Sequence, residues 1–236
     1  MNLIFSKTIF AFYIMIENIK LFFEITKFRL SLLVALSSVF GFFISSSNVD
    51  IYEVFILLVG GYLISSSSVI NNQILEKDLD KMMNRTNKRP IPTGRISIYK
   101  SVIMSIFSMI IGLFLISFYL NIYAALLSFI SLILYSFVYT PMKKFGPIAV
   151  FIGAIPGALP PLIGWVASTG QITLEAIIIF SIQFIWQFPH FWAIAWMYDD
   201  DYKKVGFKLL PNNGEKNLKT AAVSYTHLRA HETNSN

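Results

Sequence analysis

The sequence contains no cysteine and few charged residues. None of its 236 residues is Cys, which excludes disulfides, thiolate metal sites and a cysteine nucleophile. Charged residues make up 14% of the chain, against about 25% in an ordinary soluble domain, and this excludes a soluble enzyme. The chain also lacks the short segments of alternating polarity that a membrane β-barrel requires. What is present is a hydrophobic chain, 55% apolar and with 22 Phe residues.

The apolar residues fall in runs long enough for a helix to cross a lipid bilayer. They predict an all-α, polytopic transmembrane helical bundle with about six spans. The expected spans are residues 29–48, 52–71, 98–120, 122–140, 147–166 and 172–198. We expect residues 1–28 to form an N-terminal cytoplasmic or interfacial segment, and residues 29–222 to form the transmembrane domain.

Basic residues occur only in alternate connections between these spans. Residues 77–100 contain seven Lys and Arg residues, and further lysines follow the fourth and sixth spans. The connections around 45–50, 119–122 and 168–173 contain none. The positive-inside rule therefore predicts that the N-terminus and the basic loops are cytoplasmic. Because the net positive charge of the chain comes from these loops, it does not indicate a nucleic-acid partner.

Residues 223–236 differ from the rest of the chain. They are polar where another span is expected to begin, and they resemble an adapter-derived artefact of translated sequence collections. We expect this tail to be non-native and the bundle to be incomplete at its C-terminal end.

A carboxamide and two carboxylates follow the second apolar run at four-residue spacing, at Asn72, Glu76 and Asp80. In a continuous helix this spacing places all three on one face. Oxygen ligands in such a row suit Mg²⁺ bound by a substrate's phosphates, because Mg²⁺ takes one or two carboxylates and keeps phosphate and water at its other positions. An exposed helix end could carry the same residues without binding anything.

Basic side chains follow this row at Arg85, Lys88 and Arg89. They can neutralise a diphosphate, Arg through a forked pair of hydrogen bonds and Lys as a point charge. The alternative is that they only determine membrane orientation. Tyr139 and Lys143 end the fourth span on the same side, where an interfacial aromatic belt is the competing interpretation.

The sixth span contains Gln187 and His190 within membrane depth, where polar groups are expensive and usually functional. A buried His is more often simply hydrogen-bonded than a ligand. Residues 199–201 are three consecutive aspartates on the cytoplasmic side. They form a second acidic cluster that we expect to face the first.

Together these motifs resemble the UbiA superfamily of membrane-embedded aromatic prenyltransferases. The resemblance rests on residues 72–94, on Tyr139-Thr140-Pro141 with Lys143, and on the block Trp186–Trp192, which is most similar to the haem-farnesylating branch. It implies metal ligation by Asn72, Glu76, Asp80, Asp200 and Asp201. It implies catalytic roles for Asn72, Asp80, Lys143 and Asp201. It implies substrate contacts by Arg85, Lys88, Arg89, Tyr139, Lys143, Gln187, His190 and Asp200.

The function that the resemblance implies is transfer of a farnesyl group from farnesyl diphosphate to haem B, with Mg²⁺ as cofactor. His190 would contact the haem. The expected setting is the lipid bilayer of a bacterial plasma membrane, in contact with haem A synthase or cytochrome oxidase assembly. Two alternatives stay open: prenyl transfer to a quinone-ring precursor, and a cation transporter.

Overall fold

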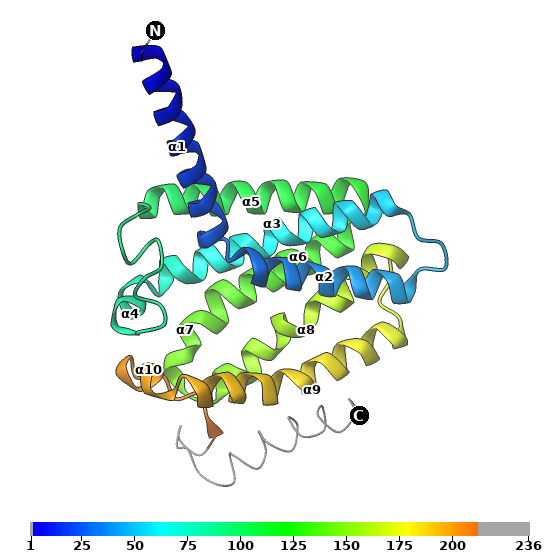
Figure 1. Ribbon diagram of the computed structural model, residues 1–236. Helices are drawn as coiled ribbons and strands as arrows, with labels where there is room; N and C mark the ends of the chain where they lie inside the picture. The colour runs from blue at the N-terminus through cyan, green and yellow to red at the C-terminus, as the bar shows by residue number, and fades with distance from the viewer. Residues whose placement is uncertain (1, 212–236) are drawn as a thin grey trace, which may run out of the picture.

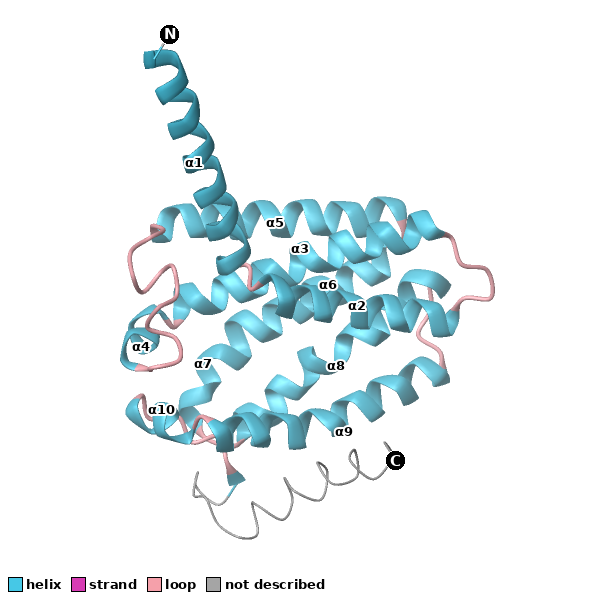
Figure 2. Ribbon diagram, in the orientation of Figure 1, coloured by secondary structure: helices cyan, strands magenta, loops and turns pink. Residues whose placement is uncertain are grey.

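A computed structural model describes residues 2–211 of the chain. The expected non-native tail, residues 223–236, lies outside the described residues. Within the described part the regular elements are all helical, as Figure 2 shows. Six helices are long and apolar enough to cross a membrane, so the all-α, multi-pass bundle predicted from the sequence is confirmed.

The six spans match the six predicted apolar runs. Five are single helices: α2 (Phe28–Ser45), α3 (Ile51–Leu75), α5 (Ile98–Tyr119), α8 (Ile148–Thr169) and α9 (Leu174–Met197). The fourth span is composite, with α6 (Ile122–Ile133), the π-helix η1 (Leu134–Tyr139), α7 (Thr140–Met142) and the 3₁₀ turn η2 (Lys143–Phe145). The remaining helices are α1 (Asn2–Ile25), α4 (Lys77–Met82) and α10 (Asp199–Lys204).

Four of the spans begin at a polar side chain that caps the helix. Asp50, Ser97, Asn121 and Thr173 each accept a hydrogen bond from a backbone N–H in the first turn. Such caps satisfy donors that have no partner inside the helix. The short polar connections that the sequence places between apolar runs therefore also determine where the helices start.

The spans run roughly parallel, and α4 and α10 lie at one end of the bundle (Figure 1). Helix α3 packs on α5, α2 packs on both α3 and α8, and α9 packs on α8. Helix α8 is the most buried span and α9 the least. Helix α1 leaves the bundle at a steep angle to the spans (Figure 1). This direction is compatible with the interfacial segment expected for residues 1–28, which stays a prediction.

Proline residues inside α8 leave carbonyl groups without their usual helical donor. Pro161 has no N–H, so the carbonyl of Gly157, four residues earlier, needs another partner. Gln187 on α9 supplies it, because its Nε2 donates to the Gly157 carbonyl at 3.1 Å. A side chain of a neighbouring span thus supplies the hydrogen bond that lipid cannot give to this carbonyl. A polar residue of the sixth span, expected to contact substrate, has a packing role in this structure.

Glycines let α2 and α8 approach closely. A Cβ built on Gly164 would lie 1.7 Å from the Ser38 carbonyl oxygen, and one built on Gly41 would lie 2.0 Å from the Pro161 carbonyl oxygen. Small residues at helix crossings of this kind are typical of membrane bundles.

We expect Gly164→Ala to destabilise the protein by about 2–3 kcal/mol, because the added methyl group meets backbone that cannot move aside. Gly61→Ala is the matched control: its Cβ would contact the Ala35 Cβ at 3.5 Å, an ordinary distance. Thermal unfolding in detergent measures both. Equal melting temperatures for the two variants would contradict the close approach of α2 and α8.

Candidate functional site

The acidic row lies where α3 ends, and the helix bends there. The sequence predicted one continuous face, but α3 ends at Leu75, and Glu76, with φ −97° and ψ 8°, separates it from α4. Hydrogen bonds from Glu76 N to Asn72 O and from Asp80 N to Glu76 O remain, at 3.0 and 2.7 Å. The three residues therefore follow one another along a bent path, and this corrects the straight row.

Two buried carboxylates in this region pair with two cations from elsewhere in the chain. Asp80 is fully buried, and Arg89 Nη1 donates to its Oδ2 at 2.7 Å. Lys143 Nζ lies 2.9 Å from Glu76 Oε1 and 3.2 Å from Oε2. Removing one partner from such a pair would leave a buried charge uncompensated. The two pairs therefore hold α4, the following loop and the end of the fourth span together.

A π-helical turn places the end of the fourth span in this cluster. The Thr140 hydroxyl donates to the Tyr135 carbonyl, five residues earlier, at 2.9 Å, and it accepts from Asn72 Nδ2 at 3.2 Å. The buried Tyr139 ring lies with its centroid 4.9 Å from Lys143 Nζ. Single π-helical turns are rare and frequently occur at functional sites. Thr140 belongs to the site, although we did not assign it a role from the sequence.

The oxygen atoms of the cluster suit a divalent cation. Asp80 Oδ1 is buried and has no hydrogen-bond partner in residues 2–211. Burial raises the pKa of this carboxyl, and Arg89 opposes that shift. The Asn72 amide nitrogen donates to Glu76 Oε2 at 2.9 Å as well as to Thr140, which leaves the amide oxygen as the free acceptor.

The described residues contain no group of three or more His, Cys, Asp or Glu side chains arranged to hold a metal by themselves. Two carboxylates and an amide oxygen are nevertheless a reasonable set for Mg²⁺, because it is usually bound by one or two carboxylates plus water and substrate phosphates.

The second acidic segment contacts the loop that follows the first one, through backbone N–H groups of that loop. Asp201 accepts hydrogen bonds from the N–H groups of Asn84 and Arg85, at 3.0 and 2.9 Å, and from Lys204 Nζ at 3.0 Å. The Arg85 N–H, with these other donors, holds the pKa of Asp201 at about 2, below its ordinary 3.8. The tether is therefore complete above pH 3.8 and is lost as the pH falls through 2. Both Asp201 oxygens are already occupied by the loop after α4.

Other residues expected at the site are exposed rather than buried. Asp200 and Lys88 are exposed. Arg85 is also exposed, with its guanidinium 4.6 Å from the Tyr198 ring centroid. His190 is exposed on α9 and stacks on Trp186, with ring centroids 4.9 Å apart.

Lys27, to which the sequence assigned no role, has an unusual backbone conformation. It connects α1 to α2 and is the one described non-glycine residue with a positive φ, at 45°. That conformation costs a residue with a Cβ roughly 1–2 kcal/mol. Burial, followed by the charges of Arg89, Lys143 and Arg85, lowers the pKa of Lys27 to about 7, and Asp80 opposes this shift.

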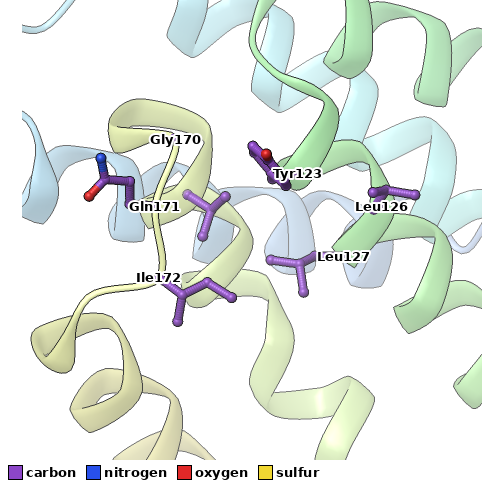
Figure 3. A pocket seen from close by; sticks show the side chains of 7 residues that line it. Tyr123, Leu126, Leu127, Gly170, Gln171 and Ile172 are labelled. Atoms are coloured by element: carbon purple, nitrogen blue, oxygen red, sulfur yellow. The ribbon is translucent and has the colours of Figure 1, made fainter.

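An apolar pocket of about 400 Å³ lies at the other end of the bundle (Figure 3). It is formed by the start of α6, the end of α8 and the connection to α9, with Tyr123, Leu126 and Ile172 among its lining residues. None of its lining side chains is charged. The charged cluster around Asp80, and not this pocket, is therefore our candidate site.

Comparison with known proteins shows which family the chain matches. The model of the UbiA prenyltransferase family matches residues 33–227. The chain is 46% identical over 214 residues to a protein of Cytophaga hutchinsonii named protoheme IX farnesyltransferase, covering 90% of this chain and 75% of that protein.

Solved structures share the fold. A digeranylgeranylglyceryl phosphate synthase superimposes with a TM-score of 0.72 at 22% identity, covering 89% of this chain and 73% of that one. A UbiA homologue from Archaeoglobus fulgidus, bound to DMAPP and Mg²⁺, gives a TM-score of 0.67 at 16% identity, covering 91% and 87%.

We expect Asp201→Ala to release the loop after α4, because the N–H groups of Asn84 and Arg85 lose their acceptor. Trypsin should then cut at exposed Arg85 and Lys88 several-fold faster than in the unmodified protein. Asp200→Ala is the control, since Asp200 is exposed and accepts no hydrogen bond within the described residues. Equal cleavage rates in the two variants would contradict the tether.

Proposed function

Because this chain belongs to the UbiA prenyltransferase family, we propose that it transfers a farnesyl group from farnesyl diphosphate to haem B to make haem O. The relatives named protoheme IX farnesyltransferase support this choice of donor and acceptor. They do not favour a quinone-ring precursor as acceptor, and they do not favour cation transport. Haem is a substrate in this reaction and not a resident cofactor.

The observation that carries the proposal is the buried Asp80 carboxylate, which pairs with Arg89 through one oxygen and has no partner at the other within the described residues. We infer that Mg²⁺ is held by Asp80 and Glu76 together with the Asn72 amide oxygen, and that it neutralises charge on the departing diphosphate. The UbiA homologue solved with Mg²⁺ and a prenyl diphosphate supports a metal of this kind. Asp200 would complete the site from α10, together with Asp201 through the lone pair of Oδ2 that remains beside its hydrogen bond from the Arg85 N–H.

Arg89 and Lys143 would bind the diphosphate. In the structure each is engaged with a carboxylate, so the substrate-free site neutralises its own charges. When the diphosphate enters, its oxygens offer these cations a second anionic partner. The site can then accept the substrate without first exposing an uncompensated buried charge. Arg85 and Lys88, which are exposed, would guide the approach of the anion.

The reacting end of the farnesyl chain would lie below the cations, among aromatic side chains. Tyr139 lies between Lys143 and Phe191, whose ring centroid is 5.6 Å from that of Tyr139. Phe188 and Trp192 belong to the same cluster of aromatic side chains. Such rings stabilise an allylic cation by cation–π contact, at about 1–2 kcal/mol each. They also exclude water that would otherwise quench the cation.

The bond changes follow from the donor and the acceptor. The C–O bond between farnesyl and diphosphate breaks, and C1 of farnesyl bonds to the terminal vinyl carbon of haem B. The positive charge then lies on the vinyl carbon next to the porphyrin. Water adds there and loses a proton, which leaves the hydroxyethylfarnesyl group of haem O.

We place the haem against α9. Gln187 is engaged with Gly157, so His190, exposed on that helix, is the better candidate for contact with the haem. We further propose a bacterial plasma membrane with the N-terminus and the site loops in the cytoplasm, since the basic loops lie at the end of the bundle that carries the site. Contact with haem A synthase or with cytochrome oxidase assembly would pass the product on.

We expect Asp80→Ala to lower haem O formation at least about 10²–10³-fold, a loss typical of removing one preorganised electrostatic group. Asp78→Ala is the matched control, because Asp78 makes only an exposed pair with Lys81 at 3.5 Å. Mass spectrometry of haem after incubation with haem B, farnesyl diphosphate and Mg²⁺ measures both. Near-normal turnover by Asp80→Ala, with normal membrane insertion, would refute the assignment.

Removal of divalent metal by chelation should abolish haem O formation, and Mg²⁺ should restore it. The physical reason is that the diphosphate leaves with its charge uncompensated when only Arg89 and Lys143 remain. Ca²⁺ should restore activity poorly, since it prefers more ligands at longer distances. Full activity in excess chelator would contradict a metal site.

A further inference from the structure

Arg95 joins the end of α1 to the loop after α4. The residue is exposed on that loop, and each of its guanidinium nitrogens donates a hydrogen bond. Nη1 donates to Glu24 Oε2 at 2.6 Å, and Nη2 donates to Glu24 Oε1 and, at 2.8 Å, to the Lys88 carbonyl. Nε donates to Thr93 Oγ1 at 3.2 Å. An isolated exposed ion pair contributes little, but a forked Arg–carboxylate pair with further hydrogen bonds fixes geometry.

These hydrogen bonds hold the backbone on both sides of Arg89. The Lys88 carbonyl belongs to the peptide group that precedes Arg89. The Arg89 carbonyl, in the peptide group that follows, accepts from Thr93 Oγ1 at 2.8 Å and from Thr93 N at 3.2 Å. Arg95 therefore contacts the first peptide group directly and the second through Thr93. The side chain positioned in this way is the one that donates to Asp80 Oδ2 at 2.7 Å.

The other end of this connection is fixed to the bundle. The carbonyl of Ile25, the last residue of α1, accepts a hydrogen bond from Gln73 Nε2 of α3 at 2.6 Å. The Ile25 side chain is fully buried and belongs to one apolar cluster with Ile91 and Ile96 of the loop after α4. The last turn of α1 is therefore anchored, and it gives the guanidinium of the loop a fixed partner.

We propose that Glu24 and Arg95 are positioning residues that aim the Arg89 guanidinium at the diphosphate of the donor. The inference rests on the proposed function, in which Arg89 binds that diphosphate. An Arg binds phosphate through a planar fork, so its contribution depends on orientation as well as on charge. A small displacement of such a group therefore weakens binding even where the charge is kept. The role of both residues is indirect, without contact to the substrate.

Removal of an acidic residue separates positioning from simple charge. Glu24→Ala makes the protein more positive, which by charge alone should tighten the binding of an anion. Loss of positioning should instead weaken binding of inorganic pyrophosphate with Mg²⁺ to the purified protein by roughly three- to tenfold, measured by calorimetry. Glu17→Ala is the matched control, because Glu17 is an exposed acid of α1 that pairs with Lys20 at 3.2 Å. Equal affinities of the two variants, or tighter binding by Glu24→Ala, would overturn the proposal.

A double-mutant cycle tests whether Arg95 acts through Arg89. Arg95 is exposed, so Arg95→Met should fold, and it should weaken pyrophosphate binding by roughly the same factor as Glu24→Ala. Arg89→Lys keeps a cation beside Asp80, but an ammonium has no fork to aim. In that background Arg95→Met should change the affinity by less than about twofold. A merely structural role does not depend on the side chain at position 89, so an equal loss in both backgrounds would overturn the proposal.

The outcomes separate this inference from the proposed function. If haem O forms but pyrophosphate binds equally to Glu24→Ala, Arg95→Met and the unmodified protein, the positioning role is wrong and the function stands. If binding depends on both residues through Arg89 but no haem O forms, the proposed acceptor is wrong and the positioning role stands. If the unmodified protein binds no pyrophosphate with Mg²⁺, the diphosphate site is wrong and both proposals are overturned.

Discussion

The structure depends on keeping two carboxylates charged at the end of an apolar bundle. Asp80 and Glu76 are buried, and an isolated carboxylate in such surroundings would be expensive enough to lose its charge. Arg89 and Lys143 make the ionised forms tolerable, because each lies within hydrogen-bond distance of its carboxylate. The bend at Glu76 and the π-helical turn before Lys143 are both local distortions that bring these partners together.

The same pairs explain how the proposed anion site can exist without a bound anion. The cations are compensated by carboxylates, and the carboxylates by cations, so the substrate-free cluster is stable. Each partner can form a second interaction, a carboxylate with a metal and a cation with phosphate. One carboxylate oxygen, Asp80 Oδ1, has no donor in the described residues, which is why we propose Asp80 as a metal ligand.

The sequence predicted the spans well because apolar run length and loop charge are local properties. All six runs became helices, and Asp80, Arg89 and Lys143 form one cluster. The bend at Glu76 was not predictable, because it accompanies an ion pair with a residue 67 positions later. Lys27 before an apolar run looks like an orientation charge, and its positive φ in the turn between α1 and α2 depends on tertiary structure. The sequence predicted that Gln187 contacts substrate. Its hydrogen bond to Gly157 could not be predicted, because that carbonyl is freed by a proline on another helix.

The charge of the site indicates the order in which its ligands bind. Asp80 and Glu76 contribute two negative charges, and Arg89, Lys143 and Arg85 contribute three positive charges. Lys27, with a pKa near 7, adds part of a further charge at neutral pH. A site with this small excess of positive charge would attract a diphosphate more strongly than a free divalent cation. We therefore expect the metal to arrive together with the diphosphate, whose negative charge exceeds that of one Mg²⁺.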